Sequence, residues 1–115
     1  LISDDTISEL NFLFDTENQK FIHLSESWMN RGLIFLDYLI ELFMFMIKSE
    51  FINENPVVSL RKKIYQDIGI DENSFQQSSL IKIVNVLLSK KNELSLNLNP
   101  KIFYDNLLIE LKENI

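Results

Sequence analysis

The sequence contains no cysteine, two glycines, two prolines and one histidine among its 115 residues. Without cysteine, neither a disulfide nor a reactive thiol can form, which is compatible with a cytoplasmic protein. Glycine and proline supply the tight turns that a β-sandwich or β-barrel needs in large number, so their scarcity disfavours both architectures. One histidine and no cysteine are too few ligands for a typical zinc site. We therefore expect no metal and no other cofactor.

Long uninterrupted apolar runs and dense positive charge are also missing. The most apolar segment, LIFLDYLIELFMFMI, contains Asp37 and Glu41 and is shorter than the roughly 20 residues that span a bilayer. The net charge is −6, whereas nucleic-acid binders usually present a basic face. We interpret the one basic cluster, Arg61 to Lys63, as a solvated helix face. The sequence thus predicts no membrane span and no direct nucleic-acid contact.

No known catalytic motif is visible in the sequence. It has neither a glycine-rich phosphate loop nor a nucleophile elbow, and DIGIDENS lacks the alternating ligands of a calcium loop. His23 lies beside the core-like residues Phe21 and Leu24, and we interpret it as an ordinary helix-surface residue. Trp28 and the phenylalanines stand at core spacing without interleaved basic residues, so core filling explains them better than base stacking. A small helical enzyme that uses His23 is the rival hypothesis.

The chain is rich in apolar residues that recur at helical spacing. With 46% hydrophobic residues, it is long enough for one domain with one core, residues 1–115. We predict an all-α fold, a single bundle of five to six helices. The expected helices cover about 8–15, 18–30, 32–50, 56–68, 75–93 and 100–113. The signals for their ends are capping boxes at Thr6–Glu9 and Ser74–Gln77, N-cap and proline pairs at Asn55–Pro56 and Asn99–Pro100, and a left-handed C-cap at Gly69.

The helix expected at 32–50 is almost entirely apolar. Its charged residues Asp37, Glu41 and Lys48 fall into one narrow stripe when plotted at about 100° per residue. Such a helix must be enclosed on most sides, so we place it at the centre of the bundle. Met44 and Ile34 border the polar stripe. Met44 is therefore a candidate partner contact, with burial in the core as the alternative.

The last helix has two apolar faces. One carries Phe103, Tyr104, Leu107, Leu108 and Leu111, and fits the core. Nearly opposite, Ile102 and Ile109 stand among polar residues. They are either a contact with another chain or two ordinary exposed isoleucines, since apolar residues are common on protein surfaces.

Two segments resemble a known family. FLDYLIELFMFMIK, followed about fifty residues later by LSLNLNPKIFYDNLLIEL, is similar to the C-terminal domains of bacterial DNA polymerase III clamp-loader subunits, delta-prime first and gamma/tau next. Leu36, Leu39 and the Phe43 region match the first family motif. The chain departs from the family at Met44 and Phe45, where Arg-Asp is common, so that pair's polar contact is not carried over. The second motif is matched by Leu94, Asn97, Asn99, Pro100, Leu107, Leu108 and Leu111.

The resemblance implies a role in assembly. In this family the C-terminal helical domains of five subunits pack side by side into a collar, which holds the ATP-binding modules that open the sliding clamp. It implies a non-catalytic oligomerisation domain whose partners are other clamp-loader subunits. Since the chain begins at Leu1 rather than Met, we expect it to be the excised C-terminal domain of a longer protein. A dimerisation domain of a transcription regulator is the alternative.

Overall fold

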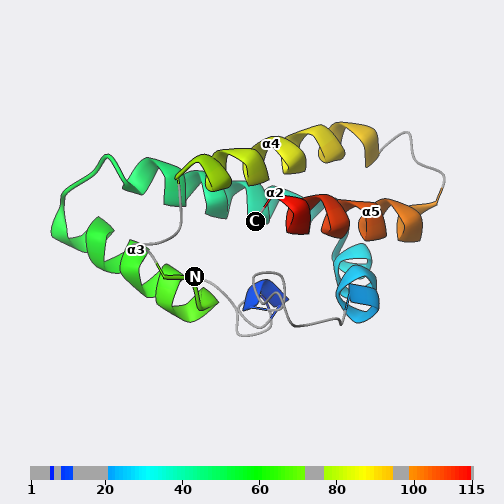
Figure 1. Cartoon of the computed structure of the whole chain (residues 1–115), viewed down its shortest axis with the longest axis horizontal. Helices are drawn as coiled ribbons and strands as arrows, with labels where there is room; N and C mark the ends of the chain where they lie inside the picture. Colours follow the sequence, from blue (N-terminus) through cyan, green and yellow to red (C-terminus); the bar gives the residue numbers. More distant parts are fainter. Residues whose placement is uncertain (1–5, 7–8, 12–20, 72–76, 95–98, 115) are drawn as a thin grey trace.

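The computed structural model describes residues 6, 9–11, 21–71, 77–94 and 99–114, and only the backbone of residues 21–23. The fold is all-α, as predicted. Helices α2 (Phe21–Ser49), α3 (Asn55–Ile68), α4 (Gln77–Leu94) and α5 (Pro100–Glu113) form an elongated bundle (Figure 1). None of the helices in the described ranges has the length and apolar content that crossing a membrane requires.

Helix α2 is broken at Gly32. This residue has φ 70° and ψ −154°, a region of backbone space that only glycine occupies readily. The part of α2 before Gly32 consequently stands at a steep angle to the part that follows (Figure 1). The two helices predicted at 18–30 and 32–50 thus correspond to the two arms of α2, and glycine is what permits the bend between them.

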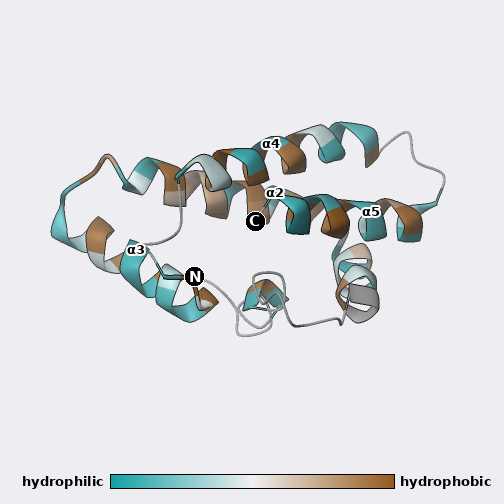
Figure 2. Ribbon diagram, in the orientation of Figure 1, coloured by the Kyte–Doolittle hydropathy of each residue, from teal (hydrophilic) through white to brown (hydrophobic). Residues whose placement is uncertain are grey.

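The second arm of α2 is the central helix, as predicted. It lies against α4 and α5, and α2 also contacts α3. The predicted polar stripe is solvated, because Asp37 is half-exposed and Glu41 and Lys48 are exposed. Hydrophobic and hydrophilic residues alternate along each helix in Figure 2, as expected for amphipathic helices around one core. The buried side chains that α2 contributes are Leu24, Trp28, Phe35, Leu36, Leu39, Ile40, Leu42, Phe43 and Met46.

Helix α3 begins one residue earlier than predicted. Its N-cap is Glu54, whose carbonyl accepts the first helical hydrogen bond from Val58 N–H at 3.0 Å. Asn55 is therefore inside the helix, and the prediction that it caps α3 is wrong. Pro56 still lies in the first turn, where its missing N–H costs nothing. Gly69 is confirmed as a left-handed C-cap, with φ 86° and ψ 24°.

Helices α4 and α5 follow the sequence prediction closely. Leu80, Ile83, Val84 and Leu87 of α4 are buried, as are all five residues of the predicted core face of α5. Asn99 caps α5, since its side-chain oxygen accepts a hydrogen bond from Ile102 N–H at 3.3 Å. Ser74 lies outside the described residues, and Gln77 donates its amide N–H to Ile47 O of α2 at 3.2 Å.

The N-terminal capping box is not what the structure contains. Thr6 already has helical backbone, together with residues 9–11, so it does not cap a helix that starts at Ser8. Glu9 also has other partners: its carboxylate accepts hydrogen bonds from Ser27 and Trp28 of α2. On α2 the Glu9 carboxylate meets an indole N–H and a guanidinium group. These are stronger hydrogen-bond donors than the backbone N–H that a capping box would offer it.

Replacing Gly32 with alanine tests the origin of the bend. No atom lies within 4 Å of the added Cβ, so the expected loss is backbone strain alone, about 1–3 kcal/mol of unfolding free energy. Urea unfolding followed by circular dichroism measures it. Asn30→Ala, at an exposed position two residues earlier, is the control and should change stability by less than about 0.5 kcal/mol. Equal stability of the Gly32 variant and the wild type would contradict the strained geometry.

Candidate interaction surfaces

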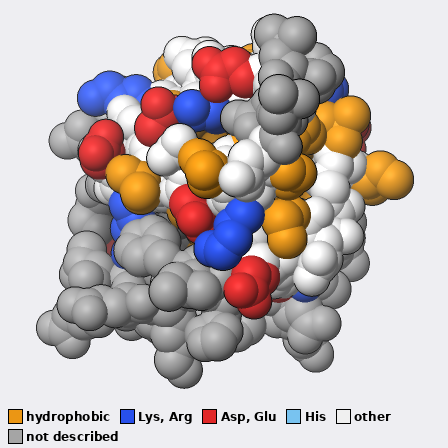
Figure 3. All heavy atoms as spheres, turned by 90° about the vertical axis from the view of Figure 1, so that its right-hand side faces the viewer, with side chains coloured by type: hydrophobic (Ala, Val, Ile, Leu, Met, Phe, Trp, Pro, Cys, Tyr) orange, Lys and Arg blue, Asp and Glu red, His pale blue; other side chains and the backbone are white. Residues whose placement is uncertain are grey.

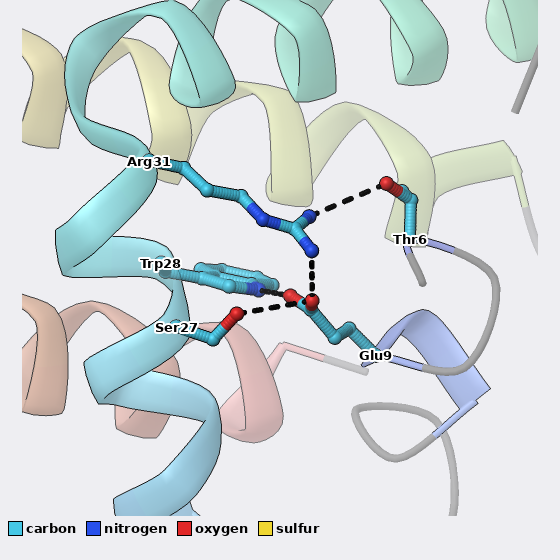
Figure 4. Close-up of polar contacts among 5 residues, drawn as sticks. All are labelled: Thr6, Glu9, Ser27, Trp28 and Arg31. Carbon is cyan, nitrogen blue, oxygen red and sulfur yellow. Dashed lines mark hydrogen bonds and ion pairs between the residues drawn. The ribbon is translucent and has the colours of Figure 1, made fainter. Parts of the chain in front are cut away.

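The most concentrated polar cluster joins the N-terminal segment to the first arm of α2. Both oxygens of Glu9 are engaged (Figure 4): one accepts from Trp28 Nε1–H at 2.6 Å and the other from Ser27 Oγ–H at 3.1 Å. The Arg31 guanidinium lies 2.5 Å from the oxygen that Ser27 also contacts. Ser27, Trp28 and Arg31 stand at positions i, i+1 and i+4 of α2, and their donor groups converge on the Glu9 carboxylate.

Arg31 extends this cluster in two directions. Its second terminal nitrogen donates to Thr6 Oγ at 3.4 Å, and its guanidinium carbon lies 4.7 Å from the centre of the Phe35 ring. Phe35 in turn packs 5.3 Å from the fully buried Trp28, centre to centre. Only 12% of the Glu9 side chain is exposed. A carboxylate with this many donors and so little solvent access acts as a structural clamp, because no oxygen is left open for a substrate or metal.

Sequence reasoning did not identify this clamp. It assigned Thr6 and Glu9 to a capping box and did not consider Arg31. The available signal was the placement of Arg31 three residues after Trp28, which puts its guanidinium on the same side of the helix as the indole. The partner of that arginine could not be read from the sequence, because Glu9 is 22 positions away in the chain.

Two features that could carry chemistry, His23 and a metal-ligand group, can be compared with the described part of the chain. The side chain of His23 lies outside the described residues. No three His, Cys, Asp or Glu side chains are grouped there closely enough to hold a metal ion. Burial raises the pKa of Tyr38 and of Tyr104, which keeps both phenols protonated and disfavours their use as bases.

The basic cluster Arg61 to Lys63 lies in the middle of α3, and one of its residues, Arg61, has a structural role. Arg61 donates a hydrogen bond to Ser49 O at the C-terminus of α2, and it lies 4.0 Å from Glu50. The Ser49 carbonyl also accepts from Ile52 N–H at 3.2 Å, and the cation of Arg61 opposes the negative end of the helix dipole there. Lys62 and Lys63 are exposed, as predicted for a solvated face.

Met44 lies at the edge of a groove between α2 and α4. Its side chain is 37% exposed, and the groove has a volume of about 120 Å³. Its walls are almost entirely apolar and are formed by Met44, Ile47, Lys48, Ile81, Val84 and Asn85. Met44, which the sequence marked as a candidate partner contact or a core residue, is thus partly exposed, and its role as a partner contact stays a prediction. Ile81 was not singled out from the sequence.

The two isoleucines of α5 stand on its outer side, as predicted. Ile102 is 54% and Ile109 is 50% exposed, while the opposite face of α5 is fully buried. Figure 3, which faces the end of the bundle where α5 begins, shows hydrophobic patches separated by acidic and basic side chains. The apolar surface at this end is therefore divided into small patches. Such patches occur both at transient protein–protein interfaces and on ordinary protein surfaces.

The residues that match the family motifs are mostly structural. Asn99 and Pro100 start α5, Leu94 is partly buried at the end of α4, and Asn97 lies outside the described residues. Leu107, Leu108 and Leu111 are buried in the same core as Leu36, Leu39 and Phe43 of α2. The two motif segments thus lie against each other through α2 and α5.

The clamp can be tested by changing Glu9 to glutamine. The neutral amide cannot match the charge of Arg31 or accept from all three donors, so we expect a loss of about 2 kcal/mol in unfolding free energy. Loss of the bond to the indole should also change Trp28 fluorescence, and this is the only tryptophan. Glu93→Gln is the matched control, since Glu93 is more than half exposed and pairs with Lys90 on the surface. A Glu9 variant as stable as the control would show that the clamp contributes little.

Tyr104 generates a prediction about pH. Its hydroxyl is buried without a hydrogen-bond partner among the described residues, and burial raises its pKa above the ordinary value. The folded state therefore resists ionisation that the unfolded chain undergoes near pH 10, so stability falls as the pH rises past that value.

Tyr104→Phe should reduce this alkaline loss and raise stability at pH 8 by up to about 1 kcal/mol, because an unpaired buried hydroxyl is removed. Urea unfolding at pH 8 and at pH 10.5 measures both effects. A variant that is less stable than the wild type at pH 8 would indicate that the hydroxyl has a partner.

Comparisons with known proteins leave the chain without an assigned family. No protein-family model, curated protein or solved structure matches it. The resemblance to clamp-loader domains rests on the two sequence segments alone.

Proposed function

We propose that this chain is a non-catalytic oligomerisation domain, which packs side by side with other helical domains as the collar domain of a replicative clamp-loader subunit does. Its role would be to hold loader subunits together in the cytoplasm while the sliding clamp is loaded during DNA replication. The delta-prime type is the preferred assignment and gamma/tau the next. Its partners would be other clamp-loader subunits, and DNA would be held elsewhere in the assembly.

The observation that carries the proposal is the two-sided character of α5. Its inner face is completely buried, yet Ile102 and Ile109, two turns apart, expose about half of their side-chain surface. Burying apolar surface on assembly yields about 25 cal/mol per Å². A row of apolar side chains on a helix that already has a complete core face is suited to a second helical neighbour.

The packing of α2 against α5 provides further support. The two segments that resemble the family come from distant parts of the sequence, and they share one core. In a collar domain the same pair of motifs is expected to build the scaffold that presents outward-facing residues.

The alternative is a dimerisation domain of a transcription regulator, which would use the same exposed residues in a two-fold contact. The sequence upstream of Leu1 in the parent protein distinguishes the two. An ATPase module with a clamp-loader zinc pattern would favour the collar domain, and a helix-turn-helix would overturn it.

Changing both Ile102 and Ile109 to aspartate tests the proposal. We expect the double variant to lose co-elution with the other loader subunits, because two charges would be buried in the contact. Helicity should stay unchanged, since both positions are half-exposed in the single chain.

Phe51→Asp is the matched control. Phe51 is 80% exposed in the turn between α2 and α3, so an acidic residue there should leave assembly intact. Unchanged co-elution of the double variant would dispose of the α5 contact, and loss of helicity would show that the isoleucines support the fold.

A further inference from the structure

The bend of α2 depends on the backbone of one residue. Gly32 is the single residue with non-helical φ and ψ between Phe21 and Ser49. Its combination of positive φ and strongly negative ψ is one that residues with a side chain rarely adopt. An added Cβ would nevertheless meet no atom within 4 Å. No neighbouring atom therefore walls in the backbone at this point.

The buried face of α2 keeps the same phase on both sides of the bend. Its positions, all buried except Gly32, recur at alternating steps of three and four residues: Ser25, Trp28, Gly32, Phe35, Leu39, Leu42 and Met46. Residues at these alternating steps share one face of a continuous helix. The sequence of α2 is thus compatible with one straight helix as well as with two arms.

An aromatic contact across the bend favours the bent form. The rings of Trp28 and Phe35 lie 5.3 Å apart, centre to centre. These two residues are seven positions apart in the sequence, which separates their Cα atoms by about 10 Å in a straight helix. The bend at Gly32 brings the two rings together from different arms of α2.

The Glu9 clamp acts on the residues next to the bend. Glu9 accepts from Trp28 at 2.6 Å and pairs with Arg31 at 2.5 Å, and Arg31 directly precedes Gly32 (Figure 4). The residue after Glu9, Leu10, is fully buried in the core. The clamp therefore ties the first arm of α2 to a segment of the chain that lies outside this helix.

The other side of the N-terminal segment lies at the end of α3. The Asn11 side-chain oxygen is 3.0 Å from the point that a Cβ on Gly69, the C-cap of α3, would occupy. The segment thus lies between α3 and the first arm of α2, as Figure 1 shows. Because it contacts both, it can hold the first arm at a fixed angle to the rest of the bundle.

We propose that α2 is a latched hinge. Gly32 is the hinge, and the Glu9 carboxylate is the latch that selects the bent form over a form in which α2 is one continuous helix. In the continuous form Gly32 takes helical φ and ψ, and Trp28 leaves both Glu9 and Phe35. The inference concerns a single chain and goes beyond the proposed assembly function.

The straight form would change the surface that α2 presents. Asp37 pairs with Lys91, and Gln77 bonds to Ile47 O, so α2 and α4 are antiparallel. A straight first arm would consequently continue past Leu94, the last residue of α4. Opening the latch would withdraw Trp28 from the site where it is now fully buried.

The distance between two spin labels on α2 tests the hinge. The wild-type chain has no cysteine, so Glu26→Cys in the first arm and Lys48→Cys in the second, both at exposed positions, can be labelled selectively. These sites are 22 residues apart and would be separated by about 33 Å in a straight helix. We expect a single, clearly shorter distance in the otherwise unchanged chain.

Two further changes release the latch and the hinge in turn. Glu9→Ala should raise the population near 33 Å about ten-fold, because a charged hydrogen-bond acceptor of the bent form is lost. Adding Gly32→Ala should make the straight form dominant, since alanine disfavours the bend and favours a helix. Helicity by circular dichroism should be retained, and Trp28 fluorescence should shift to longer wavelength. Glu93→Ala, at an exposed glutamate that pairs with Lys90, is the control and should leave the distance unchanged.

Each other result counts against the latched hinge. A single short distance in the chain that carries both Glu9→Ala and Gly32→Ala would overturn it, because packing alone would then hold the bend. A broad range of distances with reduced helicity would show that the first arm unfolds on release and does not straighten. An equal shift in the Glu93→Ala control would remove the special role of Glu9. Co-elution with loader subunits tests the proposed function separately, and none of these distances decides it.

Discussion

Helix α2 has apolar side chains around most of its second arm, and the rest of the structure is arranged to cover them. Helices α4 and α5 lie along this arm, and α3 and the N-terminal residues complete the enclosure. The stripe of Asp37, Glu41 and Lys48 reaches solvent, and so do Leu33, Ile34 and Met44 beside it. Because the hydrophobic effect grows with the apolar area removed from water, this one helix determines where its neighbours must lie.

The enclosure of α2 depends on two polar devices at its ends. Near its beginning, the Glu9 carboxylate binds Trp28 and Arg31 and attaches the N-terminal segment. At its C-terminus, Arg61 of α3 donates to Ser49 O and holds the next helix in place. Both are charge-assisted hydrogen bonds in partly buried positions, where their strength exceeds that of exposed pairs. Gly32 adds the bend that lets the first arm of α2 reach the N-terminal segment.

Some large apolar side chains remain exposed outside the completed core, and they are the most distinctive feature of the described surface. Ile102 and Ile109 are half-exposed on the outer side of α5, and Leu88 and Ile81 are exposed on α4, where Ile81 lines the groove between α2 and α4. The proposed assembly function would bury these exposed apolar side chains against partner domains.

The sequence by itself determined the helix class, the core face of α5, the Asn99 cap and the left-handed Gly69. These depend on interactions within a few residues, namely helical periodicity, a capping hydrogen bond and a backbone conformation. It also led to errors where local signals were ambiguous: Asn55 was assigned a cap that Glu54 provides, and Glu9 was assigned to its own turn. Only the tertiary structure decided which residues bind Glu9 and which residue of α4 pairs with Asp37, namely Lys91. It also decided that Met44 and Ile81 line the same groove. The physical reason is that these contacts depend on how helices distant in sequence align, which the burial of α2 sets and no short stretch of sequence encodes.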